Sequence, residues 1–291
     1  MTMSVHVVAG VTITHPDRVV AQEPEVTKLD LVRYYEAVAE VMLPHLRDRP
    51  LTLVQCAPDV ANCRYLRHSG ASRPPAQVRT VNIREQTKIG DYMVIDDTAG
   101  LIALAQRNIL EFHTWNSTTK RLETPDRIIL DLDPGPSVPW RVVVEAARQL
   151  RALLQDLGLR SWLKTTGGAG LHVVVPIAPR RDWSICLEFA KSVATSLVEH
   201  DPSRYTIAFA KQGRDDKILV DYLRNNRTNT AVCAYSARRR ETIPVSVPIA
   251  WDELSTRLRP QRWTIRTVPK RVRDSADAWD GYFEARQRLP L

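Results

Sequence analysis

Apolar residues spaced three and four positions apart predict four helices, over residues 28–46, 99–106, 137–157 and 182–200. Three of these helices begin beside a hydroxyl side chain that can cap the first turn, namely Thr27, Thr98 and Ser137. Gly158 is a suitable stop for the third helix, because glycine tolerates the left-handed conformation common at helix ends. The spacing therefore predicts helices with defined ends.

Short apolar or alternating stretches without helical periodicity predict the strands. They cover residues 51–57, 63–68, 93–95, 110–115, 128–130, 171–176, 217–222 and 230–235, with a further strand and turn within 7–18. Residues 71–81 contain prolines and are predicted to form a loop. The arginine-rich residues 251–291 are predicted to form a peripheral helix and tail.

One predicted strand, Ile128–Leu130, runs directly into Asp131 and Asp133. Side chains two apart in an extended chain point the same way, so both carboxylates share a face. Their mutual repulsion would be relieved by a hard divalent cation such as Mg²⁺ or Mn²⁺, which prefers oxygen ligands. A solvated strand end, or a helix start that favours acids, would explain the same pair.

Two later stretches add candidate chemistry. Residues 164–176 predict a strand, a glycine-rich turn and a second strand, which His172 enters just after the turn. An ordinary glycine hairpin with a satisfied histidine is the alternative. Residues 217–222 repeat the first design, because an apolar strand ends in Asp221. An acid pair, a glycine turn with histidine and a third acid thus follow one another along the chain.

In this order the motifs resemble the archaeo-eukaryotic primase superfamily, and within it the polymerase domain of bacterial DNA ligase D, the end-joining ligase. The matching stretches are 12–18, Thr27-Lys28, 39–45, 131–134, 170–172, Asp221-Tyr222 and 234–236. The resemblance implies an α+β, primase-like fold with two packed lobes, each a sheet flanked by helices, and the metal site between them. It implies one domain over residues 1–291, with an N-terminal lobe to about 120, a catalytic lobe over about 121–250 and a basic C-terminal segment over about 251–291.

The resemblance also implies template-dependent nucleotidyl transfer in non-homologous end joining. Two Mn²⁺ or Mg²⁺ ions would activate the primer hydroxyl and neutralise the leaving pyrophosphate. Asp131 and Asp133 would bridge both ions, Asp221 would complete one, and His113 matches a histidine near the metals, with a core histidine as its alternative. A preference for ribonucleoside triphosphates is implied as well. The matching nucleotide-binding residues are Thr166, Gly167, Gly168, His172, Arg224, Arg238 and Arg240.

Further matching positions imply contacts with DNA. His15, Arg18 and Lys28 match residues that hold the 5′-phosphate of a downstream strand, although Lys28 alone fits a solvated surface lysine equally well. Tyr65 and Arg67 combine an aromatic ring with a cation, which suits base stacking and phosphate contact. A half-buried sheet residue is the alternative for Tyr65.

Some positions depart from the family pattern. His15 and Arg18 replace the usual Asn and Lys, and Thr166 replaces a serine but keeps its hydroxyl. Ala169 and Asn229 stand where lysines are common, so a cation is missing near the expected triphosphate. Lysines that could replace that charge are Lys164, Lys211 and Lys217.

The net charge of +8 and the pI of about 9.5 suit a polyanionic partner, and the expected partners are DNA ends or gapped DNA with a 5′-phosphate. No apolar run is long enough to span a bilayer and no signal peptide is visible, so a bacterial cytosolic protein is expected. The four cysteines are expected to be reduced thiols, with a zinc site of Cys56, Cys63 and His68 as a minor alternative.

No Lys-x-Asp-Gly ligase motif occurs, so a stand-alone polymerase or a domain of a larger ligase is expected. Ku and a ligase are implied as indirect partners. Two other functions fit parts of the pattern: a non-catalytic module that binds DNA ends, and a metal-dependent nuclease. The first has no use for three carboxylates near phosphate, and the second does not explain the glycine turn with His172.

Overall fold

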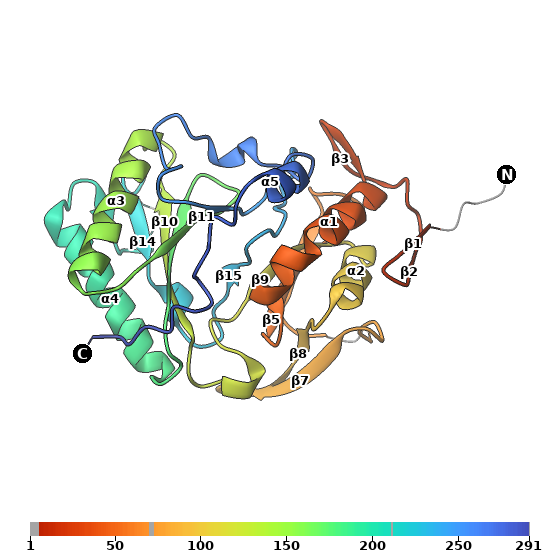
Figure 1. Ribbon diagram of the computed structural model, residues 1–291, viewed down its shortest axis with the longest axis horizontal. Helices are drawn as coiled ribbons and strands as arrows, with labels where there is room; N and C mark the ends of the chain where they lie inside the picture. The colour runs from red at the N-terminus through yellow and green to blue at the C-terminus, as the bar shows by residue number, and fades with distance from the viewer. Residues whose placement is uncertain (1–5, 70–72, 211, 291) are drawn as a thin grey trace. The chain divides into compact units, whose positions relative to one another are not determined.

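The molecule consists of two compact units, each built from three segments of the chain. The chain passes from one unit to the other five times. Unit 1 comprises Met1–Thr114, Val232–Ser246 and Arg262–Ala276, and unit 2 comprises Trp115–Ala231, Val247–Gln261 and Asp277–Leu291. The computed structural model describes residues 6–69, 73–210 and 212–290 (Figure 1). The first boundary lies close to the expected one near residue 120. Residues 232–246 and 262–276, expected in the catalytic lobe and the C-terminal segment, belong instead to unit 1.

Hydrogen bonds explain why those later segments join unit 1. The amide of Cys233 donates to the carbonyl of Phe112 at 2.9 Å, and the amide of Val245 donates to the carbonyl of Trp263 at 2.8 Å. Buried backbone groups need such partners, and neither pairing can be recognised from local spacing.

Unit 2 is built on a six-stranded sheet with the order β13-β14-β10-β12-β11-β16. Its central strand β10 (Arg127–Pro134) pairs antiparallel with both neighbours, whereas the edge strand β13 pairs parallel with β14. The other strands are β11 (Trp162–Thr165), β12 (Leu171–Pro176), β13 (Tyr205–Thr206), β14 (Ile218–Asp221) and β16 (Pro248–Ile249). Buried β-branched and leucine residues fill β10 and β12, as expected of strands covered on both faces.

Two helices pack against each other and against this sheet, α3 (Trp140–Asp156) and α4 (Trp183–His200) (Figure 1). Asp182 caps α4, because its side chain accepts a hydrogen bond from the amide of Ile185 at 3.0 Å. The predicted cap of α3 was wrong: Pro139 is its N-cap, and the amide of Ser137 donates to the carbonyl of Asp215. Proline supplies a fixed backbone angle there instead of a side-chain bond. The 3₁₀ helices of unit 2 are η1 (Thr119–Arg121), η2 (Leu223–Asn225) and η3 (Pro260–Arg262), the last reaching into unit 1.

The last segment of unit 2 is part of the core, so the prediction of a peripheral tail was wrong for it. The rings of Trp279 and Tyr282 pack with those of the sheet residue Trp162, and all three side chains are buried. The indole of Trp279 also donates to the carbonyl of Leu163 at 2.7 Å. Two aromatic residues in an arginine-rich stretch are enough to anchor it, because each buries a large apolar area.

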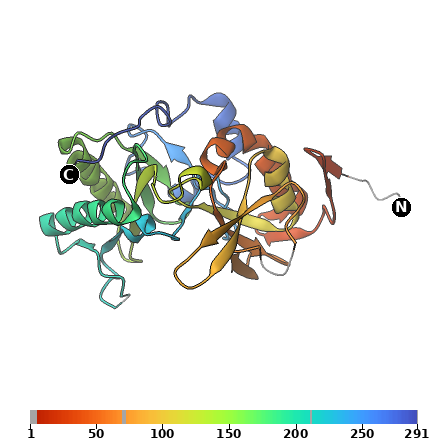
Figure 2. The same cartoon turned by 90° about the horizontal axis from the view of Figure 1, so that it is seen from below.

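Unit 1 contains a four-stranded sheet with the order β15-β9-β5-β6 and a separate hairpin. The sheet strands are β15 (Ala231–Val232), β9 (Ile109–Thr114), β5 (Leu51–Cys56) and β6 (Cys63–Leu66). The hairpin, β7 (Arg79–Arg84) with β8 (Ile89–Val94), extends outward in Figure 2. Two shorter hairpins, β1 (His6–Val8) with β2 (Val11–Ile13) and β3 (Val19–Gln22) with β4 (Glu25–Thr27), precede the helices α1 (Lys28–Leu46), α2 (Thr98–Gln106) and α5 (Val268–Asp274).

Several predictions for unit 1 hold and others need correction. Helix α1 has the predicted bounds, with Thr27 as N-cap, whereas α2 is capped by Asp97 and not by Thr98. The expected loop over 71–81 ends early, because strand β7 starts at Arg79; residues 71 and 72 lie outside the described residues. The strand predicted over 230–235 is limited to β15.

The cysteine prediction was wrong for one pair. Cys56 and Cys63 face each other in the β5–β6 pairing, with Cα atoms 4.1 Å apart, and they form a disulfide. Cross-strand register brought them together, which residue spacing did not reveal. The disulfide also removes the alternative of a zinc site at these residues. Cys186 and Cys233 are buried free thiols.

None of the helices that the structure describes is both long and apolar enough to cross a membrane.

The aromatic anchor of unit 2 can be tested by truncation. Replacing Trp279 with Ala removes a buried indole and a hydrogen bond, and we expect a loss of about 3–5 kcal/mol in the free energy of unfolding. Urea denaturation of both proteins measures it. Phe283→Ala is the matched control, because that ring is 46% exposed and its loss should cost less than about 1 kcal/mol. Equal losses from both changes would contradict this role of the segment.

Candidate active site

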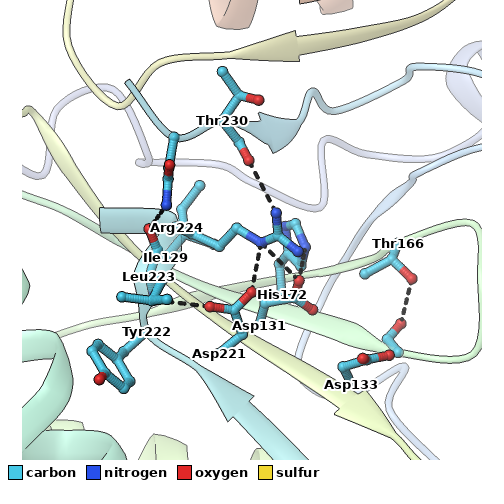
Figure 3. A network of polar contacts seen from close by, with 12 residues as sticks. Ile129, Asp131, Asp133, Thr166, His172, Asp221, Tyr222, Leu223, Arg224 and Thr230 are labelled. Atoms are coloured by element: carbon cyan, nitrogen blue, oxygen red, sulfur yellow. Dashed lines mark hydrogen bonds and ion pairs between the residues drawn. The ribbon is translucent and has the colours of Figure 1, made fainter. Parts of the chain in front are cut away.

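Strand register brings the predicted acids together at the centre of unit 2. Asp131 on β10 lies directly opposite Asp221 on β14 and, on its other side, directly opposite His172 on β12. Asp131 and Asp221 are each 7% exposed, whereas Asp133, two residues further along β10, is exposed. The predicted convergence of an acid pair, a third acid and His172 is therefore present in one sheet (Figure 3).

A guanidinium group lies between two of these acids. The Nε atom of Arg224 is 3.1 Å from an Oδ2 atom of both Asp131 and Asp221 (Figure 3). Its Nη1 donates to the carbonyl of Thr230 at 3.3 Å. Buried carboxylates require such a counter-charge, since removing an unpaired charge from water is very costly. Among the described residues no three His, Cys, Asp or Glu side chains form a ready metal cluster, and Arg224 supplies the positive charge there.

Asn225, which sequence reasoning missed, holds Arg224 in place. Its side-chain amide donates to the carbonyl of Ile129 at 2.7 Å and accepts from the amide of the same residue at 2.8 Å. This pair of bonds ties η2 to the central strand β10. Asp221 also fixes η2, because its Oδ1 accepts from the amide of Leu223 at 2.8 Å. The sequence offered one signal for it, because Asn225 is a polar residue four positions after Asp221, the acid that ends an apolar strand.

The acids do not share one electrostatic environment. Burial opposes ionisation of Asp131, but the charges of His172, Arg224 and Lys164 outweigh it and hold the pKa of Asp131 well below its usual range. Burial raises the pKa of Asp221 and of Asp133, and the nearby negative charge of Asp131 adds to both shifts. The three carboxylates therefore repel one another when all are ionised, and this repulsion favours an added cation.

His172 is buried beside Asp131, with its Nε2 3.4 Å from the Oδ2 of that carboxylate. Burial and the opposing Lys164, its cross-strand partner, lower the pKa of His172 to about 4, so the ring is neutral near pH 7. Its Nδ1 is buried without a hydrogen-bond partner among the described residues. A buried ring nitrogen in this state suits a ligand that has not yet bound.

The glycine-rich turn lies between β11 and β12 and is tied to itself. Thr166 Oγ1 accepts from the amide of Gly168 at 3.1 Å and donates to the carbonyl of Gly170 at 3.2 Å. The Gly168 amide, predicted to bind phosphate, therefore already has a partner in this structure. Gly167 has φ +70°, which glycine adopts without strain. A Cβ atom on Gly170 would lie 2.3 Å from the carbonyl oxygen of Leu132, so only glycine permits this approach to β10.

The lysines considered as substitutes for the missing charge have different positions. Lys164 is buried beside His172, and the ammonium of Lys217 donates to the carbonyl of Pro202 at 2.9 Å. Lys211 lies outside the described residues. Asn229 does not face outward freely, because its amide donates to the carbonyl of Leu223 at 2.7 Å. Of the two that the structure describes, Lys164 is the one whose charge helps to lower the pKa of Asp131.

Known proteins match this chain in sequence and in fold. The family described as "LigD, primase-polymerase domain" matches residues 27–279. This chain belongs to that family. The chain is 36% identical to the multifunctional non-homologous end joining protein LigD of Pseudomonas aeruginosa, and the alignment covers 97% of this chain and 34% of that protein. It is 32% identical to LigD of Mycolicibacterium smegmatis, over 84% of this chain and 32% of that protein.

A solved structure is also similar. The polymerase domain of Mycobacterium tuberculosis ligase D in complex with DNA matches with a TM-score of 0.86 and 30% identity, covering 93% of this chain and 96% of that one. The primase-like α+β fold is thus confirmed, and the chain is a DNA-directed nucleotidyltransferase of the metal-dependent LigD polymerase class. The chain spans about a third of the length of the LigD proteins named above.

In unit 1 of this LigD-type domain, a buried carboxylate organises predicted nucleotide-binding residues. Glu111, 1% exposed, accepts from the amide of Arg239 at 2.7 Å and lies 2.7 Å from the Nε2 of His113 and 3.2 Å from the Nε of Arg238. Burial acts to raise the pKa of Glu111, but the bond from His113 and the charge of Arg238 lower it to about 2. Arg240 is exposed. Sequence reasoning missed Glu111, although it alternates with His113 along β9.

The predicted aromatic contact residue is accessible. Tyr65 on β6 is 60% exposed, and the guanidinium of Arg239 lies 5.2 Å from its ring centroid. Arg67 is exposed as well. An exposed ring beside a cation is suited to stacking on a base, so the alternative of a half-buried sheet residue is not favoured.

The three predicted 5′-phosphate residues lie in one region of unit 1. Lys28 is 3% exposed and its ammonium donates to the carbonyl of Thr14 at 2.6 Å, while its amide donates to the carbonyl of Arg18 at 2.8 Å. A guanidinium nitrogen of Arg18 donates to Asn108 Oδ1, and its buried Nε has no partner among the described residues. His15 is exposed in the left-handed region with φ +50°.

The start of the helix after Thr27 was expected to present exposed amides to this anion, and that expectation was wrong. The amides at the start of α1 are not free for an anion, because those of Lys28 and Leu29 donate to the carbonyls of Arg18 and Pro16. The next amide, of Asp30, donates to Thr27 Oγ1 in a capping box. Any anion here must therefore be bound by side chains.

Burial, and then the neighbouring charge of Arg18, lower the pKa of Lys28 to about 8, which predicts a pH-dependent stability. The unfolded lysine has a pKa near 10.4, so between about pH 8 and 10.4 the unfolded state binds more protons and stability rises with pH. Relative to Lys28→Met, we expect the native protein to gain on the order of 1–3 kcal/mol between pH 7.5 and 10. Urea unfolding at both pH values measures this gain. Parallel pH profiles for the two proteins would show that Lys28 titrates normally.

Proposed function

We propose that this domain adds nucleotides to a primer at DNA ends or gaps during non-homologous end joining, using Mn²⁺ or Mg²⁺. The observation that carries the proposal is the placement of Asp131, Asp133 and Asp221 on adjacent strands with excess negative charge. The similarity to proteins named for non-homologous end joining supports the biological setting. Ku and a ligase are proposed as indirect partners on the same basis.

The donor set fits divalent ions, because three carboxylates with a strained balance of charge offer the oxygen ligands that such ions prefer. Asp131, Asp133 and Asp221 would hold them. When bound, the ions would lower the charge barrier for attack of a primer hydroxyl on the α-phosphate and for departure of pyrophosphate. Arg224 already neutralises part of the carboxylate charge, so added cations compete with it.

Other residues of the chain would position the nucleoside triphosphate. His172 would donate a ring N–H to a phosphate oxygen, and Thr166 would offer its hydroxyl. Arg238 and Arg240 would bind the triphosphate, with Arg238 oriented by Glu111 and His113 beside it. We further propose that ribonucleotides are preferred, as the family resemblance implies.

The metal proposal predicts the behaviour of acid variants. Asp131→Ala and Asp221→Ala should lower the rate of primer extension with Mn²⁺ by more than about 100-fold, since each removes a ligand. Asp131→Asn and Asp221→Asn keep the volume and guard against misfolding, which thermal melting checks. Asp216→Ala is the matched control, because Asp216 is an exposed acid of unit 2. Extension at the native rate by either Asp221 variant would refute the site, and shortening of the primer would indicate a nuclease.

A second readout does not depend on activity. Because Arg224 competes with added cations, Arg224→Gln should bind Mn²⁺ more tightly than the native protein in calorimetric titrations. Asp131→Asn in the same titration should bind more weakly. Unchanged affinity in both variants would place the metal elsewhere.

The 5′-phosphate proposal predicts end discrimination. A terminal phosphate carries up to about two negative charges, so gaps with a 5′-phosphate should bind about tenfold tighter than gaps with a 5′-hydroxyl. Arg18→Ala combined with Lys28→Ala should erase this difference while sparing extension on an open primer. The preference should also shrink as salt increases. Fluorescence anisotropy measures the binding.

A matched control is Arg33→Ala with Lys270→Ala, which removes the same charge from exposed positions of unit 1. That variant should keep the preference for phosphate. Equal binding of both gaps by the native protein would remove the 5′-phosphate site from the proposal.

A further inference from the structure

Unit 1 contains a cavity of about 480 Å³ that the proposed function does not use. Its apolar wall includes Leu66, Met93, Leu104 and Ile109, and its volume is within the range of small-molecule sites. We refer to it as the Arg64–Arg107 cavity, after the two arginines that line it. No carboxylate occurs among the described residues that line this cavity.

Neutral partners orient both arginines. Arg64 Nε donates to Gln55 Oε1 at 2.9 Å, and Gln55 Nε2 donates to the carbonyl of Arg107 at 2.8 Å. Arg107 Nη1 donates to the carbonyl of Arg73 at 2.6 Å. Neither guanidinium forms an ion pair with the described part of the chain, so their charge is available to an anionic ligand. Cations around an apolar wall suit a nucleotide, which combines a flat base with a phosphate.

The cavity adjoins the proposed 5′-phosphate site through three consecutive residues, 106–108. Gln106 donates to Thr14 Oγ1 at 2.6 Å, and the carbonyl of Thr14 accepts from Lys28. Asn108 accepts from Arg18 through its Oδ1 and also lines the cavity. The same side chain therefore contacts the phosphate site and the cavity.

A paired base would have to bring its partner strand into this cavity, whereas a single unpaired nucleotide can enter alone. Enzymes that bind extruded bases hold them in closely fitting pockets by apolar contact and by hydrogen bonds to the base edge. Here the wall provides the contact, and the NH₂ group of Asn108 is left to donate to a base, since only its Oδ1 is bonded within the described residues.

We propose that the Arg64–Arg107 cavity binds the base of an unpaired 5′-terminal nucleotide whose phosphate is held by Lys28 and Arg18. The inference rests on the proposed recognition of the 5′-phosphate and extends it from a charge to a nucleotide. The domain would then bind frayed or overhanging 5′ ends selectively. Arg64 and Arg107 would attract the strand and stack their guanidinium planes on the base, and the apolar wall would shield the base from water.

The test compares two 5′-phosphorylated duplexes that carry one unpaired 5′-terminal nucleotide, either adenosine or an abasic sugar. Because contact with the base stabilises the bound end, we expect the adenosine end to bind about tenfold tighter at a fixed salt concentration. Fluorescence anisotropy gives the affinities. With 2-aminopurine at that position, its emission should change on binding to the native protein.

Variants locate the effect. Leu66→Trp, which fills the cavity from a half-buried position, should bring the adenosine end close to the abasic end, and the emission change should be lost. Arg64→Gln with Arg107→Gln should weaken the preference severalfold, while Arg33→Gln, an exposed arginine of α1, should leave it intact. Thermal melting confirms that each variant is folded, and the arginine variants test the proposal if Leu66→Trp is not.

The outcomes separate this inference from the function on which it rests. Equal affinity of the native protein for the adenosine and abasic ends would overturn it, even where the 5′-phosphate preference persists. A base preference that persists without a phosphate preference would retain the cavity and refute the 5′-phosphate site. A preference that survives both Leu66→Trp and the double arginine variant would place the base outside the cavity.

Discussion

The balance between three carboxylates and the cations around them is the interaction on which the candidate active site depends. Cross-strand register places Asp131 opposite both Asp221 and His172, so the negative charge is concentrated by backbone hydrogen bonding. Arg224 keeps that concentration tolerable without a metal, and Asn225 keeps Arg224 in place through β10. These contacts keep the site folded although it carries excess negative charge, which divalent cations are proposed to neutralise. The sheet's hydrogen bonds offset the repulsion between the carboxylates.

In unit 1 the balance of charge is reversed, with positive groups in excess. There a single buried carboxylate, Glu111, is surrounded by His113, Arg238 and the Arg239 amide, and the more exposed cations are oriented from beneath. Elsewhere in this unit, the partners of Lys28 and Arg18 among the described residues are neutral, so positive charge remains in excess. An excess of one sign beside neutral hydrogen-bond partners is what allows a site to attract phosphate instead of an internal partner.

The errors in the sequence-based predictions share a physical cause. Free amides at the start of α1 were expected because the first amides of a helix have no partner within it, but the carbonyls of residues 16 and 18 accept from two of them. The thiols of Cys56 and Cys63 were expected to be reduced because the chain has no Cys-x-x-Cys pair and a cytosolic protein was expected, but strand register, which spacing does not reveal, pairs them. The C-terminal segment was expected at the periphery because its arginines dominate the composition, although Trp279 and Tyr282 decide where it packs.

Local spacing and residue type were enough to predict the helix α1 with its cap and the strand–turn–strand around the glycines, whereas the acid trio was proposed from the order of the motifs and the family resemblance. The sequence also identified the family. Three-dimensional packing was needed to show that Arg224 bridges Asp131 and Asp221, that Asn225 and Glu111 lie beneath Arg224 and Arg238, and that Asn108 contacts both Arg18 and the Arg64–Arg107 cavity. These contacts connect residues far apart in the chain, and their partners are selected by strand register and by the need to satisfy buried charge, neither of which local spacing contains.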